Sequence, residues 1–152
     1  MSVTVYFAGS NRISPVDCRL FASDLLFPGA LDLGPLFFAI FIDDLCGEIQ
    51  NSDFIMYADD VKIFKVIGSV TDAHLLEEDL QRVERWCKVN AMSLNTGKCE
   101  VITFSRRQQS NVVIHDYRIC GSHLRRVAQV KDLGVLLDSR MTFKPHVDQI
   151  IG

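Results

Sequence analysis

Apolar and polar positions alternate along the chain in blocks that predict strands and helices in mixed order. Two apolar runs, residues 54–56 and 61–64, flank a short polar turn and predict a strand hairpin that extends to about Ile67. Between Thr71 and Asn90, apolar residues recur at steps of three and four, which predicts an amphipathic helix with Thr71 as its N-cap.

A second helix is expected after Pro35, which can occupy the first turn of a helix, and it continues to Ile49. Its first two turns are apolar on nearly all faces, so we expect burial on several sides. The large side chains expected to be buried there are Leu36, Phe37, Ile40 and Phe41.

Shorter apolar runs predict the remaining elements. Further strands are expected at residues 3–8, 101–104, 112–119 and 127–137. Gly121 and Gly134 interrupt this last part, and Lys144 begins a final helix. The order predicts an α+β fold, in which helices cover one face of a small, mainly antiparallel sheet.

Composition narrows the class of protein. A chain of 152 residues is one domain or a piece of one, and 48% hydrophobic content is enough for a core. The net charge of −3 gives no global nucleic-acid signature, so any basic surface must be local. Five cysteines without a CxxC pair favour free thiols in a reducing compartment and do not favour a zinc site.

Targeting signals are not evident. The first residues lack the basic start and long apolar run of a secretory signal. The longest apolar stretch, residues 33–42, is about half of what a bilayer requires. We therefore expect an intracellular protein, nuclear or cytoplasmic, that is neither secreted nor bound to a membrane.

The acidic pair Asp59 and Asp60 stands at the turn of the predicted hairpin, after Tyr57 and Ala58. Two adjacent carboxylates repel each other unless a cation lies beside them. A hard divalent ion such as Mg²⁺ takes carboxylate oxygens together with substrate phosphates. The pair therefore indicates a phosphoryl-transfer site, while an ordinary solvated acidic turn remains the alternative.

Four segments resemble the reverse transcriptases of non-LTR (LINE-type) retrotransposons, in the family's order. Residues 57–60, YADD, resemble the active-site box, and residues 33–45 resemble the preceding helix, which reads like LGPLLFxxYINDL. Residues 86–99 resemble the WCxxNxLxLNxxKC stretch. Residues 131–135 and His146 resemble the YLGV…H segment that leads towards the thumb.

The resemblance implies a polymerase palm with its acidic hairpin presented to the primer end. It assigns residues 1–138 to a partial palm and residues 139–152 to the truncated start of the thumb. The implied activity extends a DNA primer on an RNA template from deoxynucleoside triphosphates, with Mg²⁺ or Mn²⁺ as cofactor. No obligate protein partner is evident.

The family's site residues map onto this sequence one by one. Asp59 would ligate metal, Asp60 would assist at longer range, and Lys98 would lie near the leaving pyrophosphate, although a solvated turn lysine is the alternative for Lys98. The residues implied to shape the turn or grip the primer are Tyr57, Leu133, Gly134 and Val135, although a simple sheet turn would also explain the last three. The template and nucleotide loop would include Pro28, Gly29 and Gly34.

Departures from the family pattern predict that this chain alone is inactive. Two-metal polymerases need a further aspartate from an earlier palm strand, and residues 1–34 supply no match for it. The loop that reads like GxPQGSxLGP in the family has lost its glutamine and serine here, and Asp32 adds a charge. This pattern is typical of a decayed reading frame.

Two other functions remain open. A non-catalytic relic could bind the phosphate backbone of nucleic acid through scattered arginines, although a solvated face would show the same scatter. Those arginines are Arg106, Arg107, Arg118, Arg125 and Arg126. A metal-dependent phosphohydrolase is the third hypothesis, and it also lacks a third acid.

Overall fold

The structure is a computed structural model of the chain, and it describes residues 1–8, 33–105 and 113–152. The strands are β1 (Ser2–Ala8), β2 (Asp53–Tyr57), β3 (Asp60–Val66), β4 (Glu100–Phe104), β5 (Arg118–Ile119), β6 (Ser122–His123), β7 (Arg125–Val127), β8 (Gln129–Asp132) and β9 (Val135–Asp138). The α-helices are α1 (Leu33–Ile42), α2 (Val70–Val89) and α3 (Lys144–Ile151), and the 3-10 turns are η2 (Asp43–Gly47) and η3 (Thr96–Lys98).

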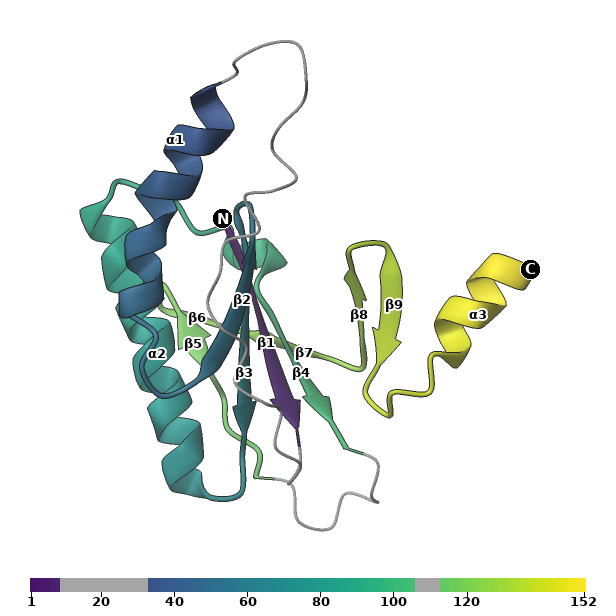
Figure 1. Ribbon diagram of the computed structural model, residues 1–152. Coiled ribbons are helices and arrows are strands. Elements are labelled where there is room, and N and C mark those ends of the chain that lie inside the picture. The colour runs from purple at the N-terminus through teal and green to yellow at the C-terminus, as the bar shows by residue number, and fades with distance from the viewer. Residues whose placement is uncertain (9–32, 106–112) are drawn as a thin grey trace.

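The central sheet is mixed, with the strand order β2-β3-β1-β4-β7 (Figure 1). β1 pairs in parallel with β3 and β4, β4 pairs in parallel with β7, and β2 and β3 form the antiparallel pair. The α+β class is consistent with this arrangement, but the expectation of a mainly antiparallel sheet was wrong. A helical crossover returns the chain to the end where the previous strand began, as α2 does between β3 and β4, so these two strands run parallel, with β1 between them.

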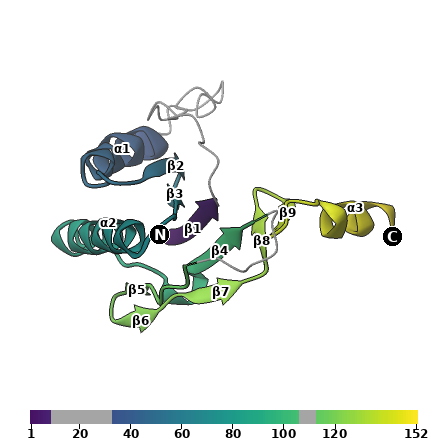
Figure 2. The same cartoon turned by 90° about the horizontal axis from the view of Figure 1, so that it is seen from below.

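Helices α1 and α2 lie on one side of this sheet, and the β8–β9 hairpin and α3 lie on the other (Figure 2). Alternation along β3 turns Val61 and Ile63 into the main core, where they meet the apolar stripe of α2. From that stripe, Leu76 and Leu80 are fully buried, as the periodicity predicts. The core therefore holds the β2–β3 hairpin firmly from one side.

The N-cap of α2 is Ser69 rather than Thr71. The Ser69 hydroxyl accepts a hydrogen bond from the Asp72 backbone N–H, and the Asp72 carboxylate accepts one from the Ser69 N–H at 2.8 Å. This reciprocal capping box satisfies two N–H groups of the first turn, and it places the helix start one residue before Thr71.

The burial expected for helix α1 was wrong. The helix begins earlier than expected, at Leu33, and η2 replaces the α-helix after Ile42. Ala39 and Ile42 face the core, but four large side chains are 42–63% exposed: Leu36, Phe37, Ile40 and Phe41. Among the described residues, neighbours pack against one side of α1 only, and its other faces stay open.

The C-terminal part contains shorter strands than expected. A strand was expected at residues 112–119, but among the described residues of this range only β5 is a strand. Residue 112 lies outside the described ranges. The region 127–137 divides into the hairpin β8–β9, because Leu133 and Gly134 adopt positive φ values of 45° and 89° and reverse the chain. Helix α3 begins at Lys144, as expected.

The four described cysteines, Cys46, Cys87, Cys99 and Cys120, are free thiols, as expected. None of the described helices combines the length and apolar character that crossing a membrane requires.

Candidate active site

The acidic pair stands at the turn of the β2–β3 hairpin. β2 ends at Tyr57 and β3 begins at Asp60, so Ala58 and Asp59 form the turn, and Tyr57 pairs with Asp60 across it. The Asp59 side chain is 69% exposed, as expected for a hairpin tip, whereas Asp60 is half-buried. The main core fixes the strands, so the carboxylates are presented from a firm base.

The start of β1 lies beside this turn. Ser2 is the parallel partner of Asp60, and the amino group of Met1 lies 3.8 Å from Asp59 Oδ2. The Met1 carbonyl accepts a hydrogen bond from the Asn95 N–H at 2.9 Å. The segment that leads into β4 is thereby tied to the same end of the sheet.

Lys98 ends the turn η3 in this segment, and it is exposed. In the parallel register of β1 and β4, Thr4 pairs with Glu100, so Lys98 lies near the level of Asp60. β1 lies between the strand of Asp60 and the strand that follows Lys98. The fold thus brings Lys98 and the acidic pair to one end of the sheet, although Lys98 lies 38 positions after Asp60 in sequence.

The donor set at the turn fits one divalent ion but not two. Mg²⁺ is commonly held by one or two carboxylates, several waters and substrate phosphates, and Asp59 and Asp60 can supply that much. Within residues 1–8, 33–105 and 113–152, no three His, Cys, Asp or Glu side chains are grouped to hold a metal ion. β3 has β2 on one side and β1 on the other. On the β1 side, the residues level with the pair are Ser2, which begins the strand, and Met1 before it, and neither side chain is a carboxylate.

The turn of the β8–β9 hairpin and the acidic turn lie at the same end of the molecule (Figure 1). Leu133 is 65% exposed at this turn, and Gly134 and Val135 follow it. Of the expected template loop, Gly34 lies in the first turn of α1 and is exposed, while Pro28 and Gly29 lie outside the described residues.

Two of the three described arginines that were expected to bind nucleic acid, Arg125 and Arg126, have side-chain partners within the chain. Arg125 forms an ion pair with Glu100. Arg126 donates hydrogen bonds to Thr103 Oγ1 and to the His115 carbonyl oxygen. Arg118 is exposed, and Arg106 and Arg107 lie outside the described ranges. Contacts of this kind favour a structural role for Arg125 and Arg126.

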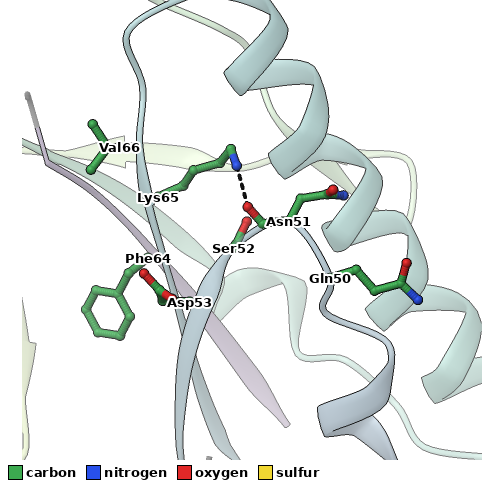
Figure 3. A pocket seen from close by; sticks show the side chains of 7 residues that line it. All are labelled: Gln50, Asn51, Ser52, Asp53, Phe64, Lys65 and Val66. Atoms are coloured by element: carbon green, nitrogen blue, oxygen red, sulfur yellow. Dashed lines mark hydrogen bonds between the residues drawn. The ribbon is translucent and has the colours of Figure 1, made fainter. Parts of the chain in front are cut away.

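A polar hollow of about 390 Å³ lies at the other end of the β2–β3 hairpin, away from the acidic turn (Figure 3). Residues 50–53 and 64–66 line it, and the Lys65 ammonium donates to the Asn51 carbonyl oxygen across it. It contains none of the residues that the sequence assigned to a site. The hollow is therefore separate from the candidate site at the acidic turn.

Sequence reasoning missed a buried ion pair near the acidic turn. Lys62 is only 4% exposed, and its ammonium pairs with the Asp132 carboxylate. The Tyr6 hydroxyl donates to the same carboxylate at 3.2 Å. Burial, and after it the charge and hydrogen bond of Asp132, raises the pKa of Tyr6, so its hydroxyl stays a proton donor. The sequence signal that could have shown this pair is the spacing of Lys62, which lies two residues after Asp60, so both side chains point to the same face of β3.

Residues 22–137 match the family model described as reverse transcriptase (RNA-dependent DNA polymerase). The RNA-directed DNA polymerase from mobile element jockey of Drosophila funebris is 31% identical over 130 residues, which cover 78% of this chain and 13% of that protein. The jockey polymerase of Drosophila melanogaster is 28% identical, with the same two coverages.

A third relative is the probable RNA-directed DNA polymerase from transposon BS of Drosophila melanogaster. It is 29% identical over 76% of this chain and 14% of its own length. The chain thus spans about an eighth of the length of the curated relatives it matches. No solved structure matches it.

Proposed function

Because the chain belongs to the reverse transcriptase (RNA-dependent DNA polymerase) family, we propose that it is part of the palm of such a polymerase from a non-LTR retrotransposon. The observation that carries the proposal is the acidic pair at an exposed hairpin turn, held from behind by a packed core. In this assignment residues 1–138 belong to the palm and residues 139–152 begin the thumb.

The substrates are an RNA template, a DNA primer and deoxynucleoside triphosphates. A bound Mg²⁺ or Mn²⁺ supplies positive charge to the substrate phosphates. Asp59, the more exposed carboxylate, offers oxygens to the ion, and Asp60 supports it from the start of β3. Lys98 lies about two strands away, where its ammonium can approach the far end of a triphosphate.

The turn of the β8–β9 hairpin faces the primer in this proposal. Leu133 and Gly134 form an exposed turn at the same end as the acidic pair, and Val135 begins the returning strand. Tyr57, also exposed, closes the acidic turn opposite Asp60. A primer end placed between the two turns would meet apolar surface on one side and carboxylates on the other.

We expect the chain alone not to polymerise. In the described arrangement β3 has a strand on both sides, and neither neighbour brings a third carboxylate to the level of Asp60. Among the described residues, a two-metal centre therefore stays incomplete, because two carboxylates cannot clamp both the attacking and the leaving oxygen.

Primer extension tests this proposal. Purified chain, a primed RNA template, nucleotides and Mg²⁺ or Mn²⁺ should give no product, whereas salt-dependent binding of the primed template should be measurable. Extension that disappears in Asp59→Asn would show an active enzyme and contradict the expected inactivity. Binding that is unchanged in Asp59→Asn and Leu133→Ala, but lost when Arg118 is replaced, would favour the non-catalytic binding module.

A further inference from the structure

The β8–β9 hairpin lies on the open face of the central sheet without sharing its ladder. It forms a separate two-stranded sheet, so strand pairing does not fix its position on the five-stranded one. At its base, the Ser105 N–H donates to the Ser139 carbonyl oxygen at 3.0 Å. In its middle, Val130 packs with Tyr6 and Ile102. These contacts anchor the base and the middle, and they leave the tip to be fixed by other contacts.

The contact nearest the tip is made by Asp132, the last residue of β8 before the turn. Its carboxylate pairs with the Lys62 ammonium and accepts a hydrogen bond from the Tyr6 hydroxyl. Lys62 lies on β3 two residues after Asp60. Side chains alternate along a strand, so Asp60 and Lys62 point to the same face of the sheet. One charged contact thus joins the strand of the acidic pair to the tip of the hairpin.

Both groups on the sheet side are held firmly. The Tyr6 ring stacks between Phe64 and Phe104, with ring centroids 4.7 and 5.7 Å away. Lys62 is 4% exposed and stands between Ile55 of β2 and Thr4 of β1 in the register. The carboxylate of Asp132 therefore meets a fixed hydroxyl and a fixed ammonium.

Burial of Lys62 makes this contact selective for one position of the hairpin. A buried ammonium without a partner is strongly unfavourable, so the sheet accepts Lys62 in this place only while Asp132 lies beside it. Apolar contacts such as those of Val130 tolerate small shifts of the hairpin. The ion pair with Lys62 and the hydrogen bond from Tyr6 form together only when the Asp132 carboxylate lies at one position. Docking of the hairpin and burial of Lys62 are therefore coupled.

We propose that Lys62, Tyr6 and Asp132 form a latch that fixes the tip of the β8–β9 hairpin relative to the acidic turn. They are positioning residues, because they hold two other groups of residues at a set separation. That this separation accommodates a primer 3′ end rests on the proposed function. The latch itself is a property of the chain alone.

Amide hydrogen exchange on the whole chain tests the latch. Asp132→Asn and Lys62→Met should each speed exchange of the β8–β9 amides about tenfold or more relative to the α2 amides. The matched controls, Asp53→Asn on an exposed β2 residue and Lys131→Met on the same hairpin, should leave that ratio unchanged. The exchanged pair Lys62→Glu with Asp132→Lys should restore part of the protection.

Two outcomes would overturn the latch. One is exchange in Asp132→Asn that equals the Asp53→Asn control. The other is an equal rise in β8–β9 and α2, which would show a contribution to global stability without local positioning.

A cross-linking experiment separates the latch from the proposed function. A photo-reactive residue at Leu133 should cross-link to the last nucleotides of a labelled primer on an RNA template. This product should fall about fivefold or more in Asp132→Asn and persist in Asp53→Asn, since a released tip samples many positions. Absence of the product in the otherwise unchanged chain would contradict the placement of the primer, and the exchange ratios would still decide the latch.

Discussion

At the scale of single residues, several turns of the described chain contain side-chain-bearing residues in left-handed backbone, and the acidic turn and the β8–β9 turn are among them. Ala58 has a φ of 51° in the acidic turn, and Leu133 has a φ of 45° in the β8–β9 turn. Each such residue costs about 1–2 kcal/mol relative to ordinary backbone. The β5–β6 turn has the same feature at Cys120, with a φ of 51°, so this backbone strain belongs to the tight turns of the fold and does not by itself mark the two turns beside the proposed primer.

Leu133→Asn should stabilise the isolated chain by about 0.5–1 kcal/mol, because Asn-Gly suits a turn with two positive φ values and Leu133 is mostly exposed. Urea unfolding at fixed pH measures this change. Leu133→Val, which also removes exposed apolar surface but is β-branched, should destabilise. A Leu133→Asn variant that is less stable than the parent chain would contradict the turn geometry.

Sequence reasoning at this scale located the acidic pair but missed its buried neighbour. Asp59 and Asp60 were found because apolar runs on both sides predict a hairpin whose turn must be polar. Lys62 was missed because a lysine on a strand is normally exposed, and its partner Asp132 is 70 residues away in sequence. A pair that distant forms only when the whole chain folds.

At the scale of elements, Asp138 organises the connection from β9 to α3. Its carboxylate accepts hydrogen bonds from the backbone N–H groups of Arg140, Thr142 and Phe143 and from the Thr142 hydroxyl, at 2.8–2.9 Å. Burial alone would raise the pKa of Asp138, but these hydrogen bonds outweigh it and lower the pKa below its usual value of 3.8. The turn therefore depends on the ionised carboxylate.

Acidification should weaken this connection. A carboxyl whose pKa is lowered by folding contributes its full stabilisation above the unfolded value near 3.8 and loses it as the pH falls through the folded value. Asp138→Asn should cost about 1–3 kcal/mol at pH 7 and should reduce the loss of stability below pH 4. Urea unfolding from pH 3 to 7 checks both parts. Equal pH profiles for the two proteins would contradict this role of Asp138.

Element types were predictable where the pattern is local, and strand partners were not. The periodicity of α2 and the alternation around the β2–β3 turn are properties of short windows, and both elements form as expected. The pairing of β1 with β3 and β4 joins segments that are about 60 and 100 residues apart, so no window contains it. That is why the sheet was expected to be mainly antiparallel.

At the scale of the whole molecule, the chain exposes a contiguous apolar stripe on α1. Leu36, Phe37, Ile40 and Phe41 are 42–63% exposed. The apolar pattern of α1 predicted burial on several sides, but a face of a helix is buried only where other elements pack against it. Among the described residues, that cover is present on one side of the helix.

The isolated chain should therefore associate and unfold at modest temperature. Each large apolar side chain left uncovered forfeits about 1.5–3 kcal/mol, against a net stability of roughly 5–15 kcal/mol for a domain. Light scattering beside thermal unfolding should show aggregation, and Phe37→Ser with Ile40→Gln should reduce it. A monodisperse parent chain with a sharp transition above about 65 °C would contradict this expectation.

The central claim is that the acidic turn is where a polymerase palm holds its divalent ion. Mn²⁺ broadens NMR signals of nearby amides, so a titration of the whole chain locates the ion directly. We predict the strongest broadening at residues 57–61 and at the adjacent Ser2, which is lost in Asp59→Asn with Asp60→Asn and retained in Asp53→Asn, an exposed carboxylate at the far end of the same hairpin. Broadening that is absent from the acidic turn, or that persists without its two carboxylates, would contradict the account.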